Sequence, residues 1–340
     1  MLDALIDYGL FTAKTLTLLA LLGVFVALAL RARHQGGHEV DGGRLEITNL
    51  NDRYEDMADG LKRATLPPKA YKRWAKAEQK AHKARAKAET AERPRLFVLD
   101  FHGDLLASEV GGLRETVSAL LQEAGEGDEV LVRLDNAGGA VHEHGLGASQ
   151  LLRIRRRGIA LTVAVDRVAA SGGYLMACVA DRIVAAPFAI IGSIGVIAQL
   201  PNFHRWLQHQ GIDFELHTAG DYKRTLTLFG ENTEAGRAKL REHLEETHQL
   251  FKGFIREYRK DLDLDKVATG EYWYGEQALG LGLVDDLSTS DDYLLAARAS
   301  RDLYRLRWQS KKRPWQRLAS GMRALLTRLP AAFAGSPARD

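Results

Sequence analysis

After Pro94, short apolar segments alternate regularly with longer ones, and this alternation constrains the fold more than any other feature. Short segments rich in β-branched residues predict strands, and the longer segments between them predict helices. The expected strands are 96–101, 129–134 and 159–165, and the expected helices are 113–123 and 145–155. Because such alternation produces a mostly parallel sheet covered by helices, we expect an α/β domain over residues 95–297. Within it, residues 233–259 predict a long charged helix that Asn232 caps.

An apolar stretch near the start of the chain has the length of a membrane-spanning helix. Residues 8–30 carry Lys14 as their only charge, and about 20 apolar residues are enough to cross a bilayer. A cleaved signal peptide begins with positive charge, whereas this chain begins with Asp3 and Asp7. We expect an uncleaved transmembrane anchor within a segment 1–35, and the alternative is a buried helix of a soluble core.

Two charged regions flank the expected domain. Residues 36–94 begin with glycines and continue into a stretch rich in Ala, Lys and Glu, which predicts a mostly helical spacer. Its basic face is either solvated or attracted to anionic lipid headgroups. Residues 298–340 are basic, and the apolar and arginine side chains within 305–329 predict an amphipathic helix on a membrane or a partner. The formal charge is only +3 and is unevenly spread, so a nucleic-acid-binding surface is not expected.

Three glycine-containing segments follow apolar strands, at the edge where open α/β sheets collect ligands and reactive groups. They are Asn136–Gly139, Ala169–Tyr174 and Gly220–Arg224. In the second, Ser171 precedes an apolar helical run, and the N–H groups at a helix N-terminus favour negative charge near its hydroxyl. The N–H of Gly172 is one candidate donor to an oxyanion, and Gly138 or Gly139 supplies a second. The alternative is an ordinary serine N-cap beside a plain glycine turn.

A serine nucleophile needs a base, and two kinds of residue are candidates. His142 and His144 follow the first glycine turn with Asp135 and Glu143 nearby in the sequence, which suits a triad or a metal site. The two histidines are two residues apart, however, so they point to different sides of a helix or a strand. The other candidate is Lys223, which accepts a proton only when neutral, and burial away from water favours the neutral form. Nothing in the residues themselves selects Lys223.

A metal centre is not expected. No third ligand lies at a recognisable spacing from the two histidines, and the single cysteine excludes both a disulfide and a cysteine-cluster site. That cysteine, Cys178, lies in the apolar run 175–180, which favours packing in the core.

The order and spacing of these segments resemble the signal peptide peptidase A family of bacterial serine peptidases. The resemblance extends over the anchor, the spacer and the serine segment, and it includes the stretches 191–196, 221–228, 230–233, 268–275 and 282–285. One departure lies in the first glycine turn. Relatives usually have Ser-Pro before the two glycines, where this chain has Asn136-Ala137, so the turn lacks the residue that fixes φ.

The resemblance implies a crotonase-like fold shared with the Clp protease subunit, and a Ser–Lys dyad. Carried onto matching positions, it makes Ser171 the nucleophile and Lys223 the general base. Gly172 and the Gly138-Gly139 turn would form the oxyanion hole, while Ser193 would help to orient the lysine.

The implied protein is a serine endopeptidase of the bacterial inner membrane that acts through an acyl-enzyme without a cofactor. Its implied partners are membrane lipid, further copies of the same chain in a ring, and peptide substrates such as signal peptide remnants or membrane proteins. Arg31 and Arg33 after the anchor favour a cytoplasmic domain, whereas better-known relatives face the other compartment, so both orientations stay open. Two other classes remain as alternatives, a membrane scaffold that has kept the fold and a crotonase-type acyl-coenzyme A enzyme.

Overall fold

The computed structural model describes residues 43–88 and 93–309, together with a few positions between 12 and 23. The chain divides into two units, 1–41 and 42–340. Most of the expected anchor, 8–30, lies outside the described residues. In the described part of the chain, no helix is both long enough and apolar enough to cross a membrane.

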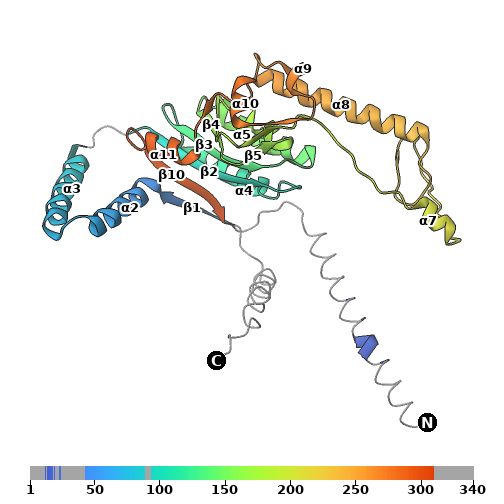
Figure 1. Cartoon of the computed structure of the whole chain (residues 1–340), viewed down its shortest axis with the longest axis horizontal. Helices are drawn as coiled ribbons and strands as arrows, with labels where there is room; N and C mark the ends of the chain where they lie inside the picture. The colour runs from blue at the N-terminus through green and yellow to red at the C-terminus, as the bar shows by residue number, and fades with distance from the viewer. Residues whose placement is uncertain are drawn as a thin grey trace, which may run out of the picture. The chain divides into compact units, whose positions relative to one another are not determined.

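The second unit is built on a mixed sheet (Figure 1). The described strands are β1 (Arg44–Asn49), β2 (Arg95–Gly103), β3 (Glu129–Asn136), β4 (Ala160–Val165), β5 (Val168–Ala170), β6 (Arg182–Ala185), β7 (Ile190–Gly192), β8 (Tyr272–Tyr274), β9 (Asp286–Leu287) and β10 (Asp302–Gln309). Their main order is β1-β10-β2-β3-β4-β6-β9, and only β1 is antiparallel to its neighbour along this path. A branch leaves the end of β3, where β5 pairs with β3 and β7, and β7 pairs with the antiparallel β8.

Helices cover the sheet on both faces. The described helices are α2 (Leu50–Thr65), α3 (Pro68–Ala88), α4 (Val110–Glu123), α5 (Val141–Arg156), α6 (Gly172–Ala177), α7 (His204–His209), α8 (Glu234–Tyr258), α9 (Leu264–Val267), α10 (Gly275–Gly280) and α11 (Ser290–Ala297). Alternate residues of β2 serve two cores, because side chains along a strand point to opposite faces. Phe97, Leu99 and Phe101 join the larger core with α4, α5 and α6. Leu96 and Val98 join the smaller one with α2 and α11.

The sheet extends beyond the range 95–297 expected from the sequence. Strand β10 lies between β1 and β2, so the sheet receives one strand from before that range and another from after it. Arg44 pairs with Gln309, the last described residue. The helix expected over 305–329 is therefore wrong at its start, because residues 305–309 form the end of β10. The rest of that segment lies outside the described residues.

Helix α8 agrees with the expectation for 233–259 except at its cap. Thr233, not Asn232, is the N-cap, and its side chain accepts a hydrogen bond from the backbone N–H of Gly236. Asn232 instead accepts from the backbone N–H of Thr227 and donates to its carbonyl. The amide thus closes the preceding loop, which a pattern for helix starts does not reveal.

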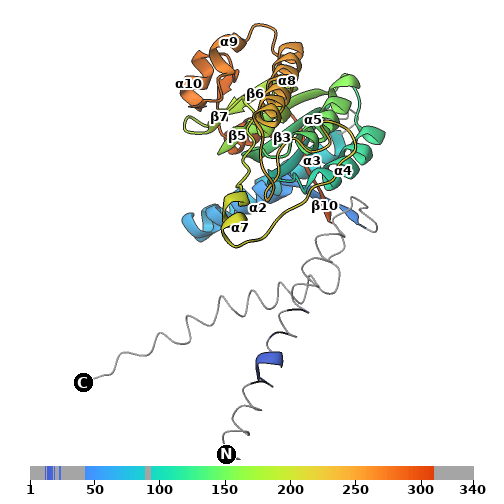
Figure 2. The ribbon, with the colours of Figure 1, turned by 90° about the vertical axis from the view of Figure 1, so that its right-hand side faces the viewer.

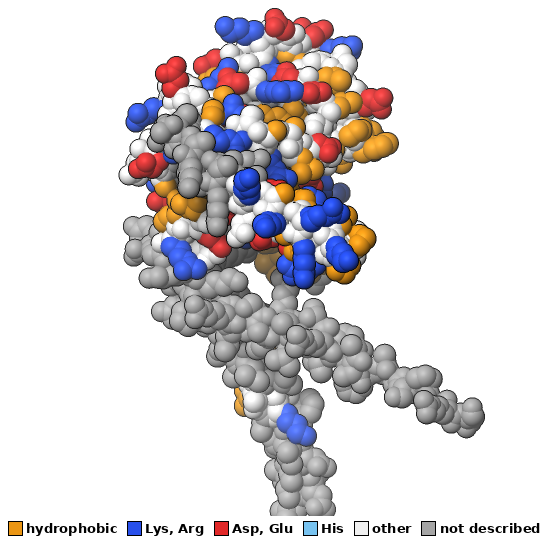
Figure 3. Space-filling view, turned by 90° about the vertical axis from the view of Figure 1, so that its left-hand side faces the viewer, with side chains coloured by type: hydrophobic (Ala, Val, Ile, Leu, Met, Phe, Trp, Pro, Cys, Tyr) orange, Lys and Arg blue, Asp and Glu red, His pale blue; other side chains and the backbone are white. Residues whose placement is uncertain are grey.

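Helices α2 and α3 form the expected spacer. They are joined by Lys62, whose ammonium lies 4.0 Å from the ring centre of Trp74, and by a 2.8 Å hydrogen bond from Tyr71 to Asp59. The exposed basic side chains of α3 recur at helical spacing and share one face: Lys69, Lys72, Arg73, Lys76 and Lys80. Figure 3 shows lysine and arginine side chains gathered on the side of the molecule that α2 and α3 occupy. This is the face that the sequence assigned either to water or to lipid headgroups.

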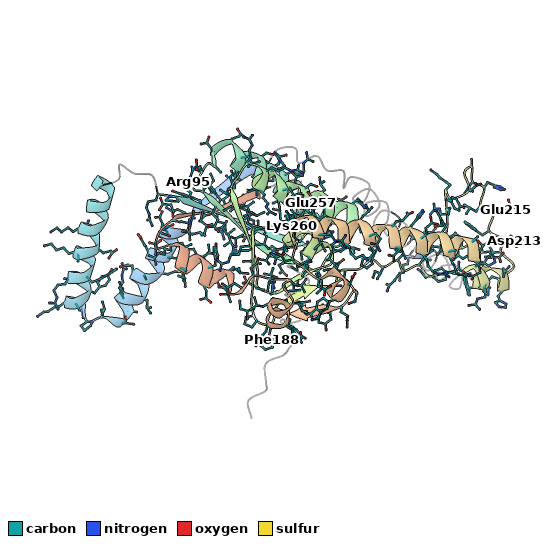
Figure 4. All side chains as sticks on the ribbon, turned by 90° about the horizontal axis from the view of Figure 1, so that it is seen from above. Arg95, Phe188, Asp213, Glu215, Glu257 and Lys260 are labelled. Atoms are coloured by element: carbon teal, nitrogen blue, oxygen red, sulfur yellow. The ribbon has the colours of Figure 1, made fainter. Side chains whose placement is uncertain are left out.

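Residues 197–250 form an arm that projects from the sheet domain in Figure 1 and is seen nearly end-on in Figure 2. The arm holds α7, the loop after it and most of α8. All of its residues are described, and only Gly230 is buried. Helix α8 joins the core at its other end, where Phe251 and Ile255 are buried. Figure 4 labels Glu257 and Lys260 at this inner end, and Asp213 and Glu215 at the outer end.

Candidate functional site

Ser171 lies at the junction between β5 and α6 with an unusual backbone. Its φ of 52° and ψ of −121° are a conformation that residues with a side chain rarely adopt. The conformation is held by hydrogen bonds from Ser171 N–H to Gly192 O at 2.8 Å, and from Leu175 N–H to Ser171 O at 3.0 Å. Strain of this kind persists where surrounding structure imposes it, and it is common at functional sites.

The serine is not an ordinary helix cap. It occupies the N-cap position of α6, but its side chain makes no capping hydrogen bond. The hydroxyl is therefore not used for local structure, which removes the main support for the capping alternative. Ser171 is also half-buried, so its hydroxyl is accessible, whereas every residue of α6 is buried.

The first glycine turn lies directly against the serine. A Cβ on Gly138 would be 2.7 Å from Ser171 Cβ and 2.8 Å from Gly172 N, and one on Gly139 would be 2.2 Å from Leu105 O. Their φ angles of 88° and 157° also disfavour a side chain. Glycine is thus required at both positions so that the backbone can approach Ser171 and Gly172.

The turn leaves one of its N–H groups available. Gly138 N–H donates to Asn136 Oδ1 at 2.8 Å, whereas Gly139 N–H has no partner among the described residues. Gly172 is the first residue of α6, and the N–H groups of a first helical turn have no partner within the helix. Of the two turn glycines, Gly139 is therefore the better candidate donor, and Gly138 contributes by its small size.

The missing proline is replaced by a hydrogen bond. The Asn136 amide oxygen accepts from the N–H two residues later, which is the arrangement of an Asx turn. Asn136 is 1% exposed and also pairs with Ala169 of β5 in the sheet. The turn is consequently fixed at its start without proline.

The two histidines lie on different sides of α5, as expected. His142 is exposed and its Nε2 is 3.6 Å from Glu143. His144 is fully buried, with Nδ1 2.9 Å from Ala140 O and Nε2 3.1 Å from Asn136 Oδ1. Neither ring is hydrogen-bonded to Ser171 in this structure. Within the described ranges, no group of three potential metal ligands occurs.

Ser193 lies one residue beyond the backbone contact of Ser171. It follows Gly192, whose carbonyl accepts from Ser171 N–H, and its own N–H donates to Glu271 O at 2.7 Å. Its φ of 50° is again unusual for a residue with a side chain. The β7 segment thus brings Ser193 to the neighbourhood of Ser171.

Lys223 is placed differently from the other candidates. It is exposed, and its backbone N–H donates to Gly220 O at 3.2 Å in a turn of the arm. Its neighbour Tyr222 lies beneath the ammonium of Lys239, at 5.2 Å. On α8, Lys239 precedes the buried residue Phe251 by 12 residues, which corresponds to about 18 Å along the helix axis. A single chain therefore leaves Lys223 out on the arm and without the burial that a lysine base requires.

Helix α6 is fixed behind the serine by buried polar groups. Tyr174 is fully buried and its hydroxyl donates to Leu283 O at 3.0 Å. Burial raises the pKa of Tyr174 and that of the Cys178 thiol well above their usual values. Cys178 is thus a core residue, as the sequence predicted, and its protonated thiol is not a competing nucleophile.

The inner end of α8 is held by an ion pair. Arg259 donates to Asp285 at 2.8 and 2.9 Å, and to Gly282 O. Burial raises the pKa of Asp285, but the hydrogen bonds from Arg259 and from Ile183 N–H outweigh it and lower the pKa overall. This pair anchors the helix that carries the arm.

Sequence reasoning placed Asn136 in the first glycine turn but did not find its role in fixing that turn, and it did not find the Arg259–Asp285 pair. Asn136 had a local signal, because asparagine two residues before glycine favours an Asx turn. The ion pair had none, since its members are 26 residues apart.

Comparison with known proteins decides the family. A model described as peptidase family S49 N-terminal matches residues 3–151, and one described as peptidase family S49 matches residues 153–304. A probable protease SohB of Haemophilus influenzae is 48% identical over 321 residues, covering 91% of this chain and 90% of the relative. The chain belongs to peptidase family S49.

A second curated relative agrees with this assignment. A probable protease SohB of Buchnera aphidicola subsp. Schlechtendalia chinensis is 45% identical over 307 residues, covering 87% of this chain and all of the relative. Among solved structures, a 1510-N membrane-bound stomatin-specific protease has a TM-score of 0.42 at 13% identity, over 61% of this chain and 85% of that chain. Membership of family S49 confirms the resemblance seen in the sequence and makes the chain a serine-type peptidase. The scaffold and acyl-coenzyme A alternatives find no support among these relatives.

Proposed function

We propose that this peptidase is a membrane-anchored endopeptidase whose nucleophile is Ser171. The observation that carries the proposal is a strained, uncapped serine beside a glycine turn, in a region where Gly139 N–H and Gly172 N–H have no partner in the described structure. In this mechanism Ser171 Oγ attacks a peptide carbonyl carbon and loses its proton to a base. The resulting oxyanion accepts hydrogen bonds from Gly172 N–H and Gly139 N–H. When the tetrahedral intermediate collapses, the proton passes to the leaving amine, and water then hydrolyses the acyl-enzyme.

The proposed base is Lys223, on the strength of the family resemblance. Because the side chain is exposed in a single chain, its desolvation has to come from a surface that covers the arm. We assign this surface to a second copy of the chain in a homo-oligomer. The exposed apolar side chains of the arm support a protein partner of this kind: Ile197, Leu200, Phe203, Trp206, Ile212, Phe214, Leu216, Tyr222, Leu228, Phe229 and Leu250.

The aromatic residues of the arm form a cluster. The ring centres of Phe203 and Phe229 are 6.1 Å apart, and those of Phe214 and Phe229 are 5.8 Å apart. Each of these rings is still more than 40% exposed, so the cluster is only half covered. Burying its open side in an oligomer would also bring Lys223 away from water. Ser193 would then help to orient the lysine, as in the family pattern.

The proposed location is the bacterial inner membrane, with residues 8–30 as a single-pass anchor. An anchor confines the active site to peptides near the membrane, which supports signal peptide remnants and membrane-associated proteins as substrates. The resemblance also supports a crotonase-type arrangement like that of the Clp protease subunit. In it, Ser171 lies where the β5–β7–β8 branch leaves the main sheet.

The test of this proposal is the reaction of Ser171 itself. The purified full chain in detergent should be labelled at Ser171 by a fluorophosphonate probe and should cleave fluorescein-labelled casein. Ser171→Ala should abolish both, with a loss of roughly 10⁴-fold or more in kcat, as for other serine nucleophiles. The matched control is Ser149→Ala on α5, an exposed serine that bonds only to the carbonyl of Gly145. A Ser171→Ala chain that cleaves casein at the wild-type rate contradicts the proposal.

A further inference from the structure

A chain of buried polar groups lies directly behind the glycine turn, and the proposed reaction does not use it. Its centre is the Asn136 side chain. The amide oxygen accepts from Gly138 N–H at 2.8 Å and lies 3.1 Å from His144 Nε2, and the amide nitrogen donates to Met176 Sδ at 3.4 Å. A Cβ on Gly103 would be 2.1 Å from the amide, so the space around Asn136 is filled. The amide is held on all sides.

His144 holds this amide from α5. Its Nε2 lies 3.1 Å from Asn136 Oδ1 and its Nδ1 lies 2.9 Å from Ala140 O. Both oxygens only accept, so the single N–H of a neutral ring serves one of them, and we place it on Nε2, toward Asn136. The ring is fully buried beside Ala140 of the turn that precedes it, which fixes where Nε2 points. The Nε2–H of a buried imidazole is thus the group that holds the Asn136 amide.

The same ring also supports the backbone beside the serine. A Cβ on Gly172 would be 2.5 Å from His144 Cγ, so the imidazole packs against the residue whose N–H faces the oxyanion. A Cβ on Gly173 would be 2.1 Å from Asn136 O. Both candidate donors, on the turn and at the start of α6, therefore rest on the His144–Asn136 pair.

We propose that His144 is a positioning residue for the oxyanion hole: through Asn136 it fixes the turn that carries Gly138 and Gly139 against Ser171. It makes no contact with the reacting atoms. In a turn without proline, this hydrogen-bonded pair supplies the constraint that a fixed φ would otherwise give. The inference rests on the proposed role of Ser171, because a turn positioned for an oxyanion matters only if an oxyanion forms there.

The first experiment compares two phenylalanine variants of the full chain in detergent. His144→Phe keeps a ring against Gly172 but removes the hydrogen bond to Asn136, and His142→Phe changes the exposed neighbour on the same helix. Because removing one oxyanion donor costs about 10²–10³ in kcat, loss of its positioning should lower kcat for a fluorogenic peptide about 10- to 100-fold. KM should stay within about twofold, since the ground state makes no use of the hole. His142→Phe should match the wild type.

A second pair of variants separates the two ring nitrogens and remains informative if His144→Phe does not fold. In His144→Gln the side-chain amide can replace the donor at Nε2, and in His144→Asn the shorter amide reaches only the position of Nδ1. The proposal expects His144→Gln to keep most of the wild-type kcat and His144→Asn to lose it. A peptide boronate, which mimics the tetrahedral intermediate, should lose affinity by the same factor as kcat/KM in each variant.

A double variant tests whether the two residues act through one turn. Asn136→Ala should lower kcat as much as His144→Phe, and the two changes together should lower it no further, because coupled residues are not additive. Wild-type kcat in His144→Phe, or equal losses in His144→Gln and His144→Asn, overturns the inference. When one of these results occurs and Ser171→Ala is inactive in the same assay, the inference about His144 is wrong but the proposed function stands. When Ser171→Ala is active as well, the proposed function is also wrong.

Discussion

The region around Ser171 and the arm around Lys223 are constructed in opposite ways. Near the serine, the backbone is strained, the flanking helix is buried and polar atoms such as the Asn136 amide have partners. On the arm, Gly230 is the only buried residue between 197 and 250, and large aromatic side chains face outward. One half of the proposed dyad is therefore complete within a chain, and the other half is not.

This difference teaches where the precision of the site comes from. A nucleophile and an oxyanion hole must be held within fractions of an ångström, which packing in a core achieves. A lysine base needs removal from water, and an interface provides that equally well. Under the proposed mechanism, an arm with its apolar residues exposed suits a base that becomes competent only after assembly, and an isolated chain would then not act as a peptidase.

The largest expected effect comes from removing Ser171 from one chain and Lys223 from another. Lys223→Ala and Ser171→Ala should each be inactive alone. If a neighbouring copy covers the arm so that its lysine serves another chain's serine, mixing the two variants through reversible denaturation restores about a quarter of the wild-type activity, the fraction of sites with both residues intact. Casein cleavage measures this. No recovery in mixed oligomers would place both residues of each dyad in one chain.

A smaller effect is expected within the rigid half. Gly138→Ala puts a Cβ 2.7 Å from Ser171 Cβ at a φ of 88°, so the turn must move away from the serine. We expect kcat to fall about 10²- to 10³-fold, as for loss of an oxyanion donor. Gly145→Ala on α5, where a Cβ meets nothing within 4 Å, is the control. Unchanged kcat in Gly138→Ala would remove this turn from the mechanism.

The arm should respond at the level of assembly. Trp206→Glu places a charge on a side chain that is 60% exposed in a single chain, so it should weaken the oligomer with little effect on folding. We expect a lower mass by light scattering in detergent and about a tenfold drop in activity at low protein concentration. Leu295→Glu, on α11 and 52% exposed, should change neither quantity. Equal masses for both variants would show that the arm is not an interface.

The smallest effect concerns the Arg259–Asp285 pair at the inner end of α8. The pKa of Asp285 is lowered in the folded chain, so its contribution to stability is present above about pH 4, its unfolded range, and is lost as pH falls through the folded value. The carboxylate is about one-third exposed, and solvent screening limits the contribution to about 1 kcal/mol. As the pH falls from 7 through the folded pKa, wild-type Tm should thus fall more than that of Asp285→Asn, by about 2–4 °C once the carboxylate is protonated. Asp286→Asn, which breaks the exposed pair with Arg182, should behave like the wild type.

The parts of the fold that sequence predicts well are those set by neighbouring residues. The glycines after Ser171 and the apolar run of α6 are consecutive, so this part of the serine's setting follows from local patterns, whereas the short strand β5 directly before it was not expected. The sequence predicts a helix where the structure has the end of β10, because apolar and arginine residues there fit the helical period as well as the strand period. The strand forms through pairing with β1, which lies some 260 residues away in the chain. The burial of His144 is likewise tertiary, since it depends on how α5 packs against α6.

The pairing of β1 with β10 also sets how the domain bears a load. Arg44 and Gln309 lie opposite each other at the end of an antiparallel ladder, so the chain enters and leaves the sheet at one corner. Force applied before Arg44 and after Gln309 would break the hydrogen bonds of that ladder one after another, starting at this end, rather than all at once. If the preceding segment is held in a bilayer, a pull on the tail would peel away β10 first, together with the edge that it gives to β2. A proposed anchor before β1 would thus hold the catalytic sheet at the corner where it opens most easily.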